Sequence, residues 1–216
     1  IGVLLSGCGV FDGSEIHEAV LTLLYLDQAG AEIICMAPDM DQMHVIDHLT
    51  QEVSDEKRNV LVESARIARG AIQNVKDVKA LDIDALIIPG GFGAAKNLSD
   101  FAVSGAEAKV HAEVKRLVNE LISAEKPVGA ICIAPATLTK AMADQKPEVT
   151  IGNDAGTASA IEKMGGQHQN CSVDMIHVDP NNRVVTTPAY MLGPSIKDVA
   201  VGIDKLVQQT WATTKS

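Results

Sequence analysis

The sequence predicts an α/β protein in which helices cover both faces of a mostly parallel β-sheet. Short, continuously apolar runs alternate along the chain with longer segments whose apolar residues recur every three or four positions. Strands that are apolar on both sides are typical of a parallel sheet buried between two helical layers. Several of these runs also end in glycine-rich or cysteine-containing turns, and sites in such folds form at the carboxyl ends of strands.

The first half of the chain contains three expected strands and two expected helices. Residues 1–5 are aliphatic and end in SGCG, which indicates a buried strand. Residues 14–29 keep helical spacing up to Gly30, which ends the helix. The remaining expectations are a strand at 31–37, a polar loop at 41–59, a short helix at 60–69 and a strand at 85–88 that runs into PGGFG.

The second half continues the alternation. One face of a long helix is marked by Val110, Val114, Leu117, Val118, Leu121 and Ile122. The expectations that follow are a strand from 128, a turn at 132, a helix to about 143, a strand at 149–152, a helix at 155–164, strands at 171–178 and 183–187, and a helix at 194–211. No repeat or linker divides the sequence, so residues 1–216 are expected to form a single domain.

Composition and charge exclude several functional classes. The 216 residues carry a formal net charge of −10, which disfavours nucleic acid or an anionic membrane surface as a partner, because both would be repelled. No apolar run approaches the roughly 20 residues of a membrane span. The four cysteines, at positions 8, 35, 132 and 171, form no C-x-x-C pair, so neither a zinc site nor a disulfide framework is expected.

Free thiols suit a reducing compartment, and we expect a cytoplasmic location. The chain begins at Ile1, inside an expected strand and without a methionine. Residues are therefore expected to precede it, and import into an organelle is an open alternative.

Residues 126–138 carry the strongest chemical signal. An apolar run leads into Cys132, and a helix-like segment follows at once, which is the pattern of a nucleophile elbow. The dipole and free N–H groups of the following helix would favour the thiolate. The alternative is a buried structural cysteine. Two further turns, at residues 6–9 and 89–93, also follow strands and are expected to meet Cys132 in one crevice, which favours the nucleophile.

Four motifs in the same order resemble the ThiJ/PfpI superfamily and, more narrowly, its ElbB subfamily. They are SGCGVFDGSEIHEAV, IIPGGFGAAKNLSDF, PVGAICIAPA and VVTTPAYM. The resemblance implies a flavodoxin-like three-layer α/β/α sandwich, often dimeric, with a cysteine nucleophile. For ElbB-like members it implies a cofactor-independent glyoxalase that acts on small 2-oxoaldehydes.

One departure from the superfamily pattern bears on the reaction. PfpI-like proteins often carry a histidine directly after the nucleophile, where this chain has Ile133. Amide hydrolysis needs such a partner to protonate the leaving amine. Glutamine hydrolysis and proteolysis are therefore disfavoured, whereas a glyoxalase needs only a thiolate, one carboxylate and N–H donors for the developing oxyanion.

Candidate roles follow from this chemistry. Cys132 is the expected nucleophile, and the N–H groups of Gly91 and Ile133 are the expected oxyanion donors. Gly90 belongs to the same PGG turn, which allows a close backbone approach. The alternative for these glycines is a turn that requires positive φ.

Glu18 and Glu15 compete for the role of acid and base. In the superfamily pattern a glutamate precedes an Ala-Gly pair by one helix length, and Glu18 fits that spacing. Residues 12–15 have spacing like that of a capping box, so Glu15 has a helix-capping alternative. His17 is a candidate substrate contact, and Cys8 a candidate pocket residue or redox partner of Cys132. A small aldehyde substrate and a homodimer are expected, and no cofactor or metal.

Three other readings are considered. His44 and His48 are four residues apart, a spacing that suits metal binding on a helix, but no third ligand accompanies them. Gly7 and Gly9 begin a dinucleotide-like motif, but its third glycine, Gly13, is displaced by one position. The main alternative to an enzyme is a stress-response protein that senses oxidants through its reactive thiol.

Overall fold

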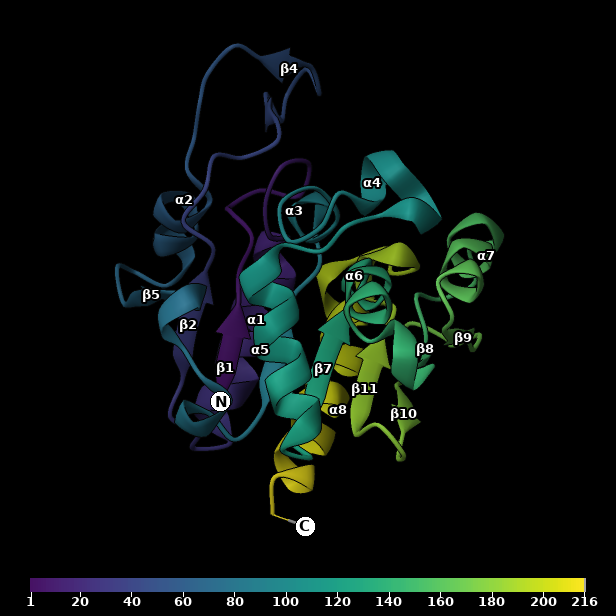
Figure 1. Cartoon of the computed structure of the whole chain (residues 1–216). Coiled ribbons are helices and arrows are strands. Elements are labelled where there is room, and N and C mark those ends of the chain that lie inside the picture. Colours follow the sequence, from purple (N-terminus) through teal and green to yellow (C-terminus); the bar gives the residue numbers. More distant parts are fainter. Residues whose placement is uncertain (216) are drawn as a thin grey trace.

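A seven-stranded sheet forms the centre of the computed structural model, which describes residues 1–215 (Figure 1). The strands, in spatial order, are β10 (His177–Asp179), β11 (Val184–Thr187), β7 (Val128–Ile131), β6 (Leu86–Ile88), β1 (Gly2–Leu4), β2 (Ile34–Ala37) and β5 (Ile72–Asn74). Every neighbouring pair is parallel except β10 with β11. The predicted mostly parallel sheet is confirmed.

Helices pack on both faces of the sheet and complete a flavodoxin-like sandwich. The longer ones are α1 (Ile16–Gln28), α2 (Val60–Ile67), α5 (Ala112–Ser123), α6 (Ala134–Ala141), α7 (Ala155–Lys163) and α8 (Ile196–Thr213). Alternate strand residues enter two separate cores. Leu4 and Ile88 pack with residues of α5 and α6, whereas Val3 and Ile87 pack with residues of α1 and α8. Double-sided burial explains why these strands read as continuous apolar runs.

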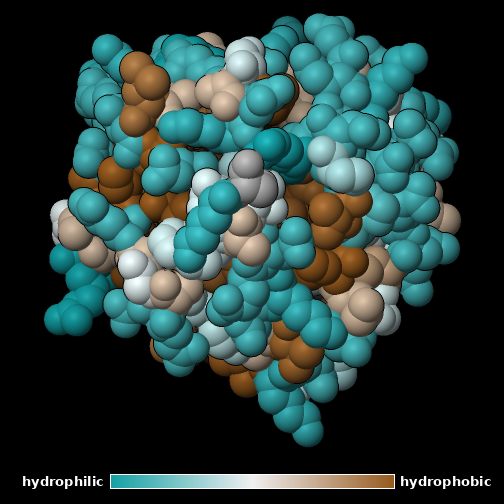
Figure 2. Space-filling model, turned by 90° about the horizontal axis from the view of Figure 1, so that it is seen from below, coloured by the Kyte–Doolittle hydropathy of each residue, from teal (hydrophilic) through white to brown (hydrophobic). Residues whose placement is uncertain are grey.

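The connections place a crevice beside β1. Helix α1 follows β1 on one face of the sheet, and α5 lies between β6 and β7 on the other face. Crossovers that leave in opposite directions open a crevice at the carboxyl ends of the two strands between them. In Figure 1 these ends point upward, away from both chain termini. The opposite end of the molecule, shown in Figure 2, is mostly hydrophilic with separate apolar areas.

Short elements surround the carboxyl end of the sheet. They are the helices α3 (Phe92–Lys96) and α4 (Phe101–Ser104), the pairs β3 (Val45–Ile46) with β4 (Val53–Ser54) and β8 (Glu148–Val149) with β9 (Gln167–His168), and the 3-10 turns η1 (Val75–Asp77), η2 (Ala80–Asp82), η3 (Gly105–Glu107), η4 (Ala143–Gln145) and η5 (Ala189–Met191).

The structure corrects several predicted boundaries. Residues 41–59 contain the antiparallel β3–β4 hairpin as well as loop. The strand expected at 171–178 begins only at His177, because just three residues pair with β11 at this sheet edge. The strand expected at 149–152 is the two-residue β8, which pairs outside the main sheet. Strand β5 was not predicted because it is three residues long and only partly buried.

Candidate functional site

The turn between β7 and α6 carries Cys132 in a strained conformation. Its φ is +62°, which residues other than glycine rarely adopt. The Cys132 N–H donates to the carbonyl of Thr187 at 3.0 Å, and Pro135 lies in the first turn of α6. These features fix the thiol at the amino end of α6, where it is only 8% exposed. The expected sharp turn between strand and helix is present.

Glu18 is completely buried beside this thiol. Its Oε2 accepts a hydrogen bond from the Gly90 N–H at 2.9 Å, and its Oε1 accepts one from the Tyr190 N–H at 3.2 Å. The carboxyl group is also hydrogen-bonded to the Cys132 side chain. Burial, and secondarily the charge of Glu15, raise the pKa of Glu18 from 4.5 to about 8. Glu18 therefore holds a proton at neutral pH.

The thiol and the carboxyl group form one coupled unit. Burial raises the pKa of Cys132, and the negative charge of ionised Glu18 raises it further. Hydrogen bonds from the N–H groups of Gly91 and Ile133 act in the opposite direction and favour the thiolate. Both groups are not ionised together at neutral pH, so the pair shares a proton. With that proton on Glu18, the carboxyl group donates to the sulfur of Cys132.

The PGG turn must be glycine for steric reasons. A Cβ on Gly90 would lie 2.4 Å from Cys132 Cβ and 2.5 Å from Glu18 Oε2. Gly91 has a φ of +92°, and a Cβ there would lie 2.3 Å from the backbone nitrogen of Glu15. These two glycines therefore let β6 approach both functional side chains.

Glu15 lies at the helix start and lines the cavity. It is the N-cap of α1, and its Oε2 accepts the N–H of Glu18 at 2.7 Å. The spacing between Asp12 and Glu15 does not form a capping box, because Asp12 instead accepts the N–H of Ile46. Glu18 is at the third helical position, where a glutamate usually bonds back to the N-cap N–H. Here that N–H donates to the Gly90 carbonyl, which leaves Glu18 free to face Cys132.

His17 and Tyr190 join at the entrance to the site. His17 is exposed, and its Nδ1 lies 2.7 Å from the Tyr190 hydroxyl. Tyr190 lies on η5, where Ala189 has a φ of +41°. The structure therefore brings His17 to the site through Tyr190.

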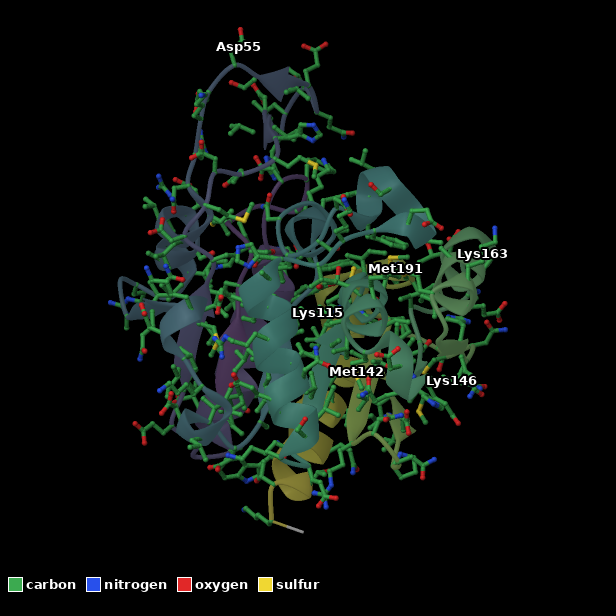
Figure 3. All side chains as sticks on the ribbon, in the orientation of Figure 1. Asp55, Lys115, Met142, Lys146, Lys163 and Met191 are labelled. Carbon is green, nitrogen blue, oxygen red and sulfur yellow. The ribbon has the colours of Figure 1, made fainter. Side chains whose placement is uncertain are left out.

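A cavity of about 380 Å³ opens onto the thiol. It is lined by Val10, Glu15, Gly91, Phe92, Ala95, Phe101, Ala102, Cys132, Ile133, Thr157, Tyr190 and Met191. None of these described lining residues is a histidine. Met191 is labelled in Figure 3, near the carboxyl end of the sheet. Sequence reasoning did not single out Phe101 or Thr157, although the scarcity of phenylalanine, three in the chain, was a usable signal for Phe101.

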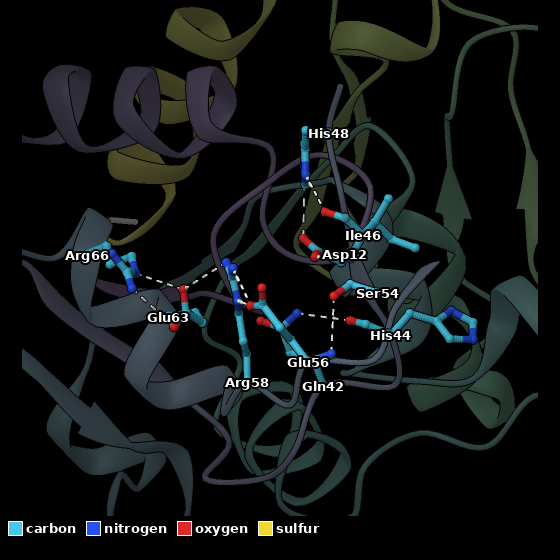
Figure 4. A network of polar contacts seen from close by, with 10 residues as sticks. All are labelled: Asp12, Gln42, His44, Ile46, His48, Ser54, Glu56, Arg58, Glu63 and Arg66. Carbon is cyan, nitrogen blue, oxygen red and sulfur yellow. Dashed lines mark hydrogen bonds and ion pairs between the residues drawn. The ribbon is translucent and has the colours of Figure 1, made fainter. Parts of the chain in front are cut away.

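Cys8 is not brought into this cavity. It is half-buried, and burial followed by the charge of Glu63 raises its pKa. Its surroundings belong to a polar network in which the loop after β1, the β3–β4 hairpin and α2 are joined (Figure 4). In that network Asp12 accepts the N–H of Ile46 at 2.8 Å and lies 3.9 Å from His48.

The histidine pair His44 and His48 has no metal-site geometry. His48 Nδ1 lies 2.9 Å from the carbonyl of Ile46, so its ring supports the hairpin. Within residues 1–215 no cluster of three or more histidine, cysteine or acidic side chains is arranged to hold a metal ion. In the same range, no helix combines the length and the apolarity that crossing a membrane requires.

Known proteins share this architecture. The chain is 47% identical to the ES1 protein homolog, mitochondrial, of Rattus norvegicus, over 99% of this chain and 84% of the relative. It is also 47% identical to the Homo sapiens glutamine amidotransferase-like class 1 domain-containing protein 3, mitochondrial, over 99% of this chain and 83% of the relative.

A solved structure agrees with these relatives. The isoprenoid biosynthesis protein with amidotransferase-like domain from Ehrlichia chaffeensis superposes with a TM-score of 0.92 at 40% identity, covering 98% of this chain and 97% of that one. The DJ-1/PfpI family matches residues 8–188, a span that contains the thiol, the buried glutamate and the PGG turn. The chain therefore belongs to the DJ-1/PfpI family, as its motifs predict.

Proposed function

We propose that this chain is a cofactor-independent glyoxalase of the ElbB type, which converts glyoxal to glycolate and methylglyoxal to lactate. The observation that carries the proposal is the hydrogen bond between Cys132 and the buried, protonated carboxyl group of Glu18. Together these two side chains supply a nucleophile and a group that both gives and accepts a proton near neutral pH.

The first step forms a hemithioacetal. The Cys132 thiolate attacks the aldehyde carbon C1 and forms an S–C1 bond, and the π-electron pair of the carbonyl moves to its oxygen. The N–H groups of Gly91 and Ile133, which already donate to the sulfur, would stabilise this oxyanion. Glu18 then gives its proton to the oxygen and becomes a carboxylate.

The second step moves a hydrogen from C1 to C2. The Glu18 carboxylate removes the C1 proton, the C1–H electron pair forms a C1=C2 bond, and the C2 carbonyl pair moves to oxygen. The enediolate that results is protonated at C2, and the C1 hydroxyl loses its proton as C1=O re-forms. C1 is oxidised and C2 is reduced, so no external oxidant is needed.

The last step releases the product. Water adds to the thioester carbonyl, the C1–S bond breaks with its electron pair on sulfur, and a 2-hydroxy acid leaves. A thiolate is a good leaving group, so this hydrolysis does not require the positioned acid that an amine leaving group needs. The isoleucine at 133 therefore suits this reaction better than amide hydrolysis.

The test is direct. Purified protein and methylglyoxal, without glutathione or added metal, should produce lactate over many turnovers. Cys132→Ala should reduce lactate formation to the rate without protein, whereas Cys171→Ala is the matched control and should behave as wild type. Lactate formation by Cys132→Ala at the wild-type rate would refute the mechanism.

A thiol redox role is the second candidate. The N–H donors and the carboxyl group around Cys132 would also hold the oxygens of an oxidised cysteine. Turnover separates the two functions, because a sensor consumes one equivalent of oxidant per thiol and an enzyme consumes substrate repeatedly.

The compartment is part of the same proposal. Four free cysteines and the mitochondrial names of two relatives support a reducing compartment, either the cytoplasm or the mitochondrial matrix.

A further inference from the structure

We infer that the cavity over Cys132 holds a neutral apolar substituent on the substrate, so that the preferred substrates are aryl or bulky alkyl 2-oxoaldehydes. This inference rests on the proposed glyoxalase function and specifies its substrate class. It concerns the part of the cavity that the thiol and Glu18 do not occupy.

The size of the cavity is the first argument. Its volume is about 380 Å³, which lies within the range of about 300–1,000 Å³ that encloses drug-sized ligands. Glyoxal and methylglyoxal would leave most of that space to water. A small substrate alone does not account for a cavity of this size.

The lining of the cavity is the second argument. The whole chain has three phenylalanines, two tyrosines and one tryptophan, and Phe92, Phe101 and Tyr190 all line this cavity. Val10 and Met191 add further apolar surface. Half of the aromatic residues of a weakly aromatic protein thus gather here, where rings favour stacked or edge-on contact with an aryl group.

The charge of the cavity is the third argument. Among its described lining residues, none is cationic, and Glu15 brings a carboxylate. Lys96 lies nearby, but its Nζ donates to the Phe11 carbonyl at 3.1 Å and lies 5.1 Å from the centre of the Phe92 ring. An anionic substituent would find no partner and would be repelled, so the substituent must be neutral.

The experiment compares matched substrates. Methylglyoxal, phenylglyoxal and 4-carboxyphenylglyoxal are assayed with wild-type protein, and phenylglyoxal is expected to give a kcat/KM about tenfold above methylglyoxal, because a phenyl group buries more apolar surface than a methyl group. The carboxylated substrate should lose that advantage. Equal kcat/KM values for methylglyoxal and phenylglyoxal would overturn the inference.

Two variants of helix α4 test the location. Ala102 lines the cavity, whereas Val103 is 69% exposed and does not. Ala102→Phe should fill the cavity and reduce the phenylglyoxal preference about fivefold or more, while Val103→Phe should leave it as in wild type. An unchanged preference in Ala102→Phe would also overturn the inference.

A binding measurement separates this inference from the proposed function. Calorimetry on Cys132→Ala compares 2-hydroxyacetophenone with hydroxyacetone, two neutral hydroxyketones that differ in the substituent. If the aryl ketone binds more tightly and Ala102→Phe weakens it, the apolar subsite stands even if no aldehyde is turned over, and only the glyoxalase proposal fails. If neither ketone binds and no aldehyde is turned over, both proposals fail.

Discussion

Two glutamates are buried at the same end of the sheet, and their surroundings give them different tasks. Glu18 is 0% exposed and is contacted by backbone N–H groups and a thiol. Glu63 is 6% exposed, and its Oε2 lies 2.7 Å from Arg66 and 3.9 Å from Arg58. Neutral donors leave Glu18 with a raised pKa and a transferable proton, whereas guanidinium groups compensate the charge of Glu63.

The comparison shows that burial alone does not identify a functional carboxyl group. What matters is whether the compensating groups carry charge. Glu63 joins α2 to the residues that follow the β3–β4 hairpin, in the polar network of Figure 4. Glu18 has no such structural partner and instead faces Cys132. We therefore expect substitutions at the two positions to affect different properties.

The largest expected effect is on turnover. Glu18→Gln removes the proton donor and acceptor and should lower methylglyoxal turnover about 100-fold or more, whereas Glu63→Gln should leave it within about twofold. Lactate formation under identical conditions measures both. Equal losses in the two variants would mean that the carboxyl group beside Cys132 has no special part in proton transfer.

The second effect is on the pH dependence of stability. Since the folded pKa of Glu18 is about 8 and its ordinary value is 4.5, the unfolded chain releases this proton first as pH rises. The stability contributed by protonated Glu18 is complete below about pH 4.5 and is lost as pH rises to 8. Between pH 5 and 8 this loss is on the order of 3 kcal/mol.

Glu18→Gln cannot lose that proton, so its stability should fall less than that of wild type over this interval. Urea unfolding at pH 5, 6.5 and 8 gives the free energy of unfolding of each protein. A constant difference between the two proteins at all three pH values would show that Glu18 is already ionised in the fold.

A third effect concerns the glycine between the two functional side chains. Gly90→Ala places a Cβ against Cys132 and Glu18 and should reduce the free energy of unfolding by about 2 kcal/mol. Gly156→Ala is the matched control, because the nearest atom to its added Cβ is 3.6 Å away and the position is helical. It should stabilise the protein by about 0.5 kcal/mol. Thermal unfolding that ranks the variants in reverse order would contradict this packing.

The smallest effect is expected at Glu63. Its partners Arg66 and Arg58 have side chains that are 65% and 42% exposed, so water solvates them once the carboxylate is removed. Glu63→Gln should therefore reduce the free energy of unfolding by about 1 kcal/mol or less. High salt should shrink the difference from wild type, and a difference that grows with salt would exclude an ion-pair origin.

Local patterns predicted most of the framework. The continuous apolar runs identified β1, β2, β6, β7 and β11, and helical spacing identified α1, α2, α5, α6, α7 and α8. Short elements such as β5 and α3 escaped prediction because three to five residues carry too little periodicity. The strand expected at 171–178 was mostly wrong, since pairing with β11 rather than residue type decides where this edge strand begins.

The candidate site was only partly predictable. The turn at Cys132 and the PGG turn were readable because both depend on local backbone geometry, and the structure brings them together. Cys8 was expected near the thiol because it also follows a strand, but its loop turns toward Glu63. Phe101 and Thr157 reach the cavity from separate helices, and no local signal connects them to Cys132.

By itself, the sequence determined the alternation of strands and helices, the sharp turn at Cys132 and the glycines that let β6 approach it, because sterics and periodicity act over a few residues. Only the tertiary structure decided between Glu15 and Glu18, which share the first turn of one helix. The packing of α1 against β6 and η5 directs Glu18 inward to Gly90, Tyr190 and Cys132. Burial, and the raised pKa that follows from it, arise from segments far apart in the chain.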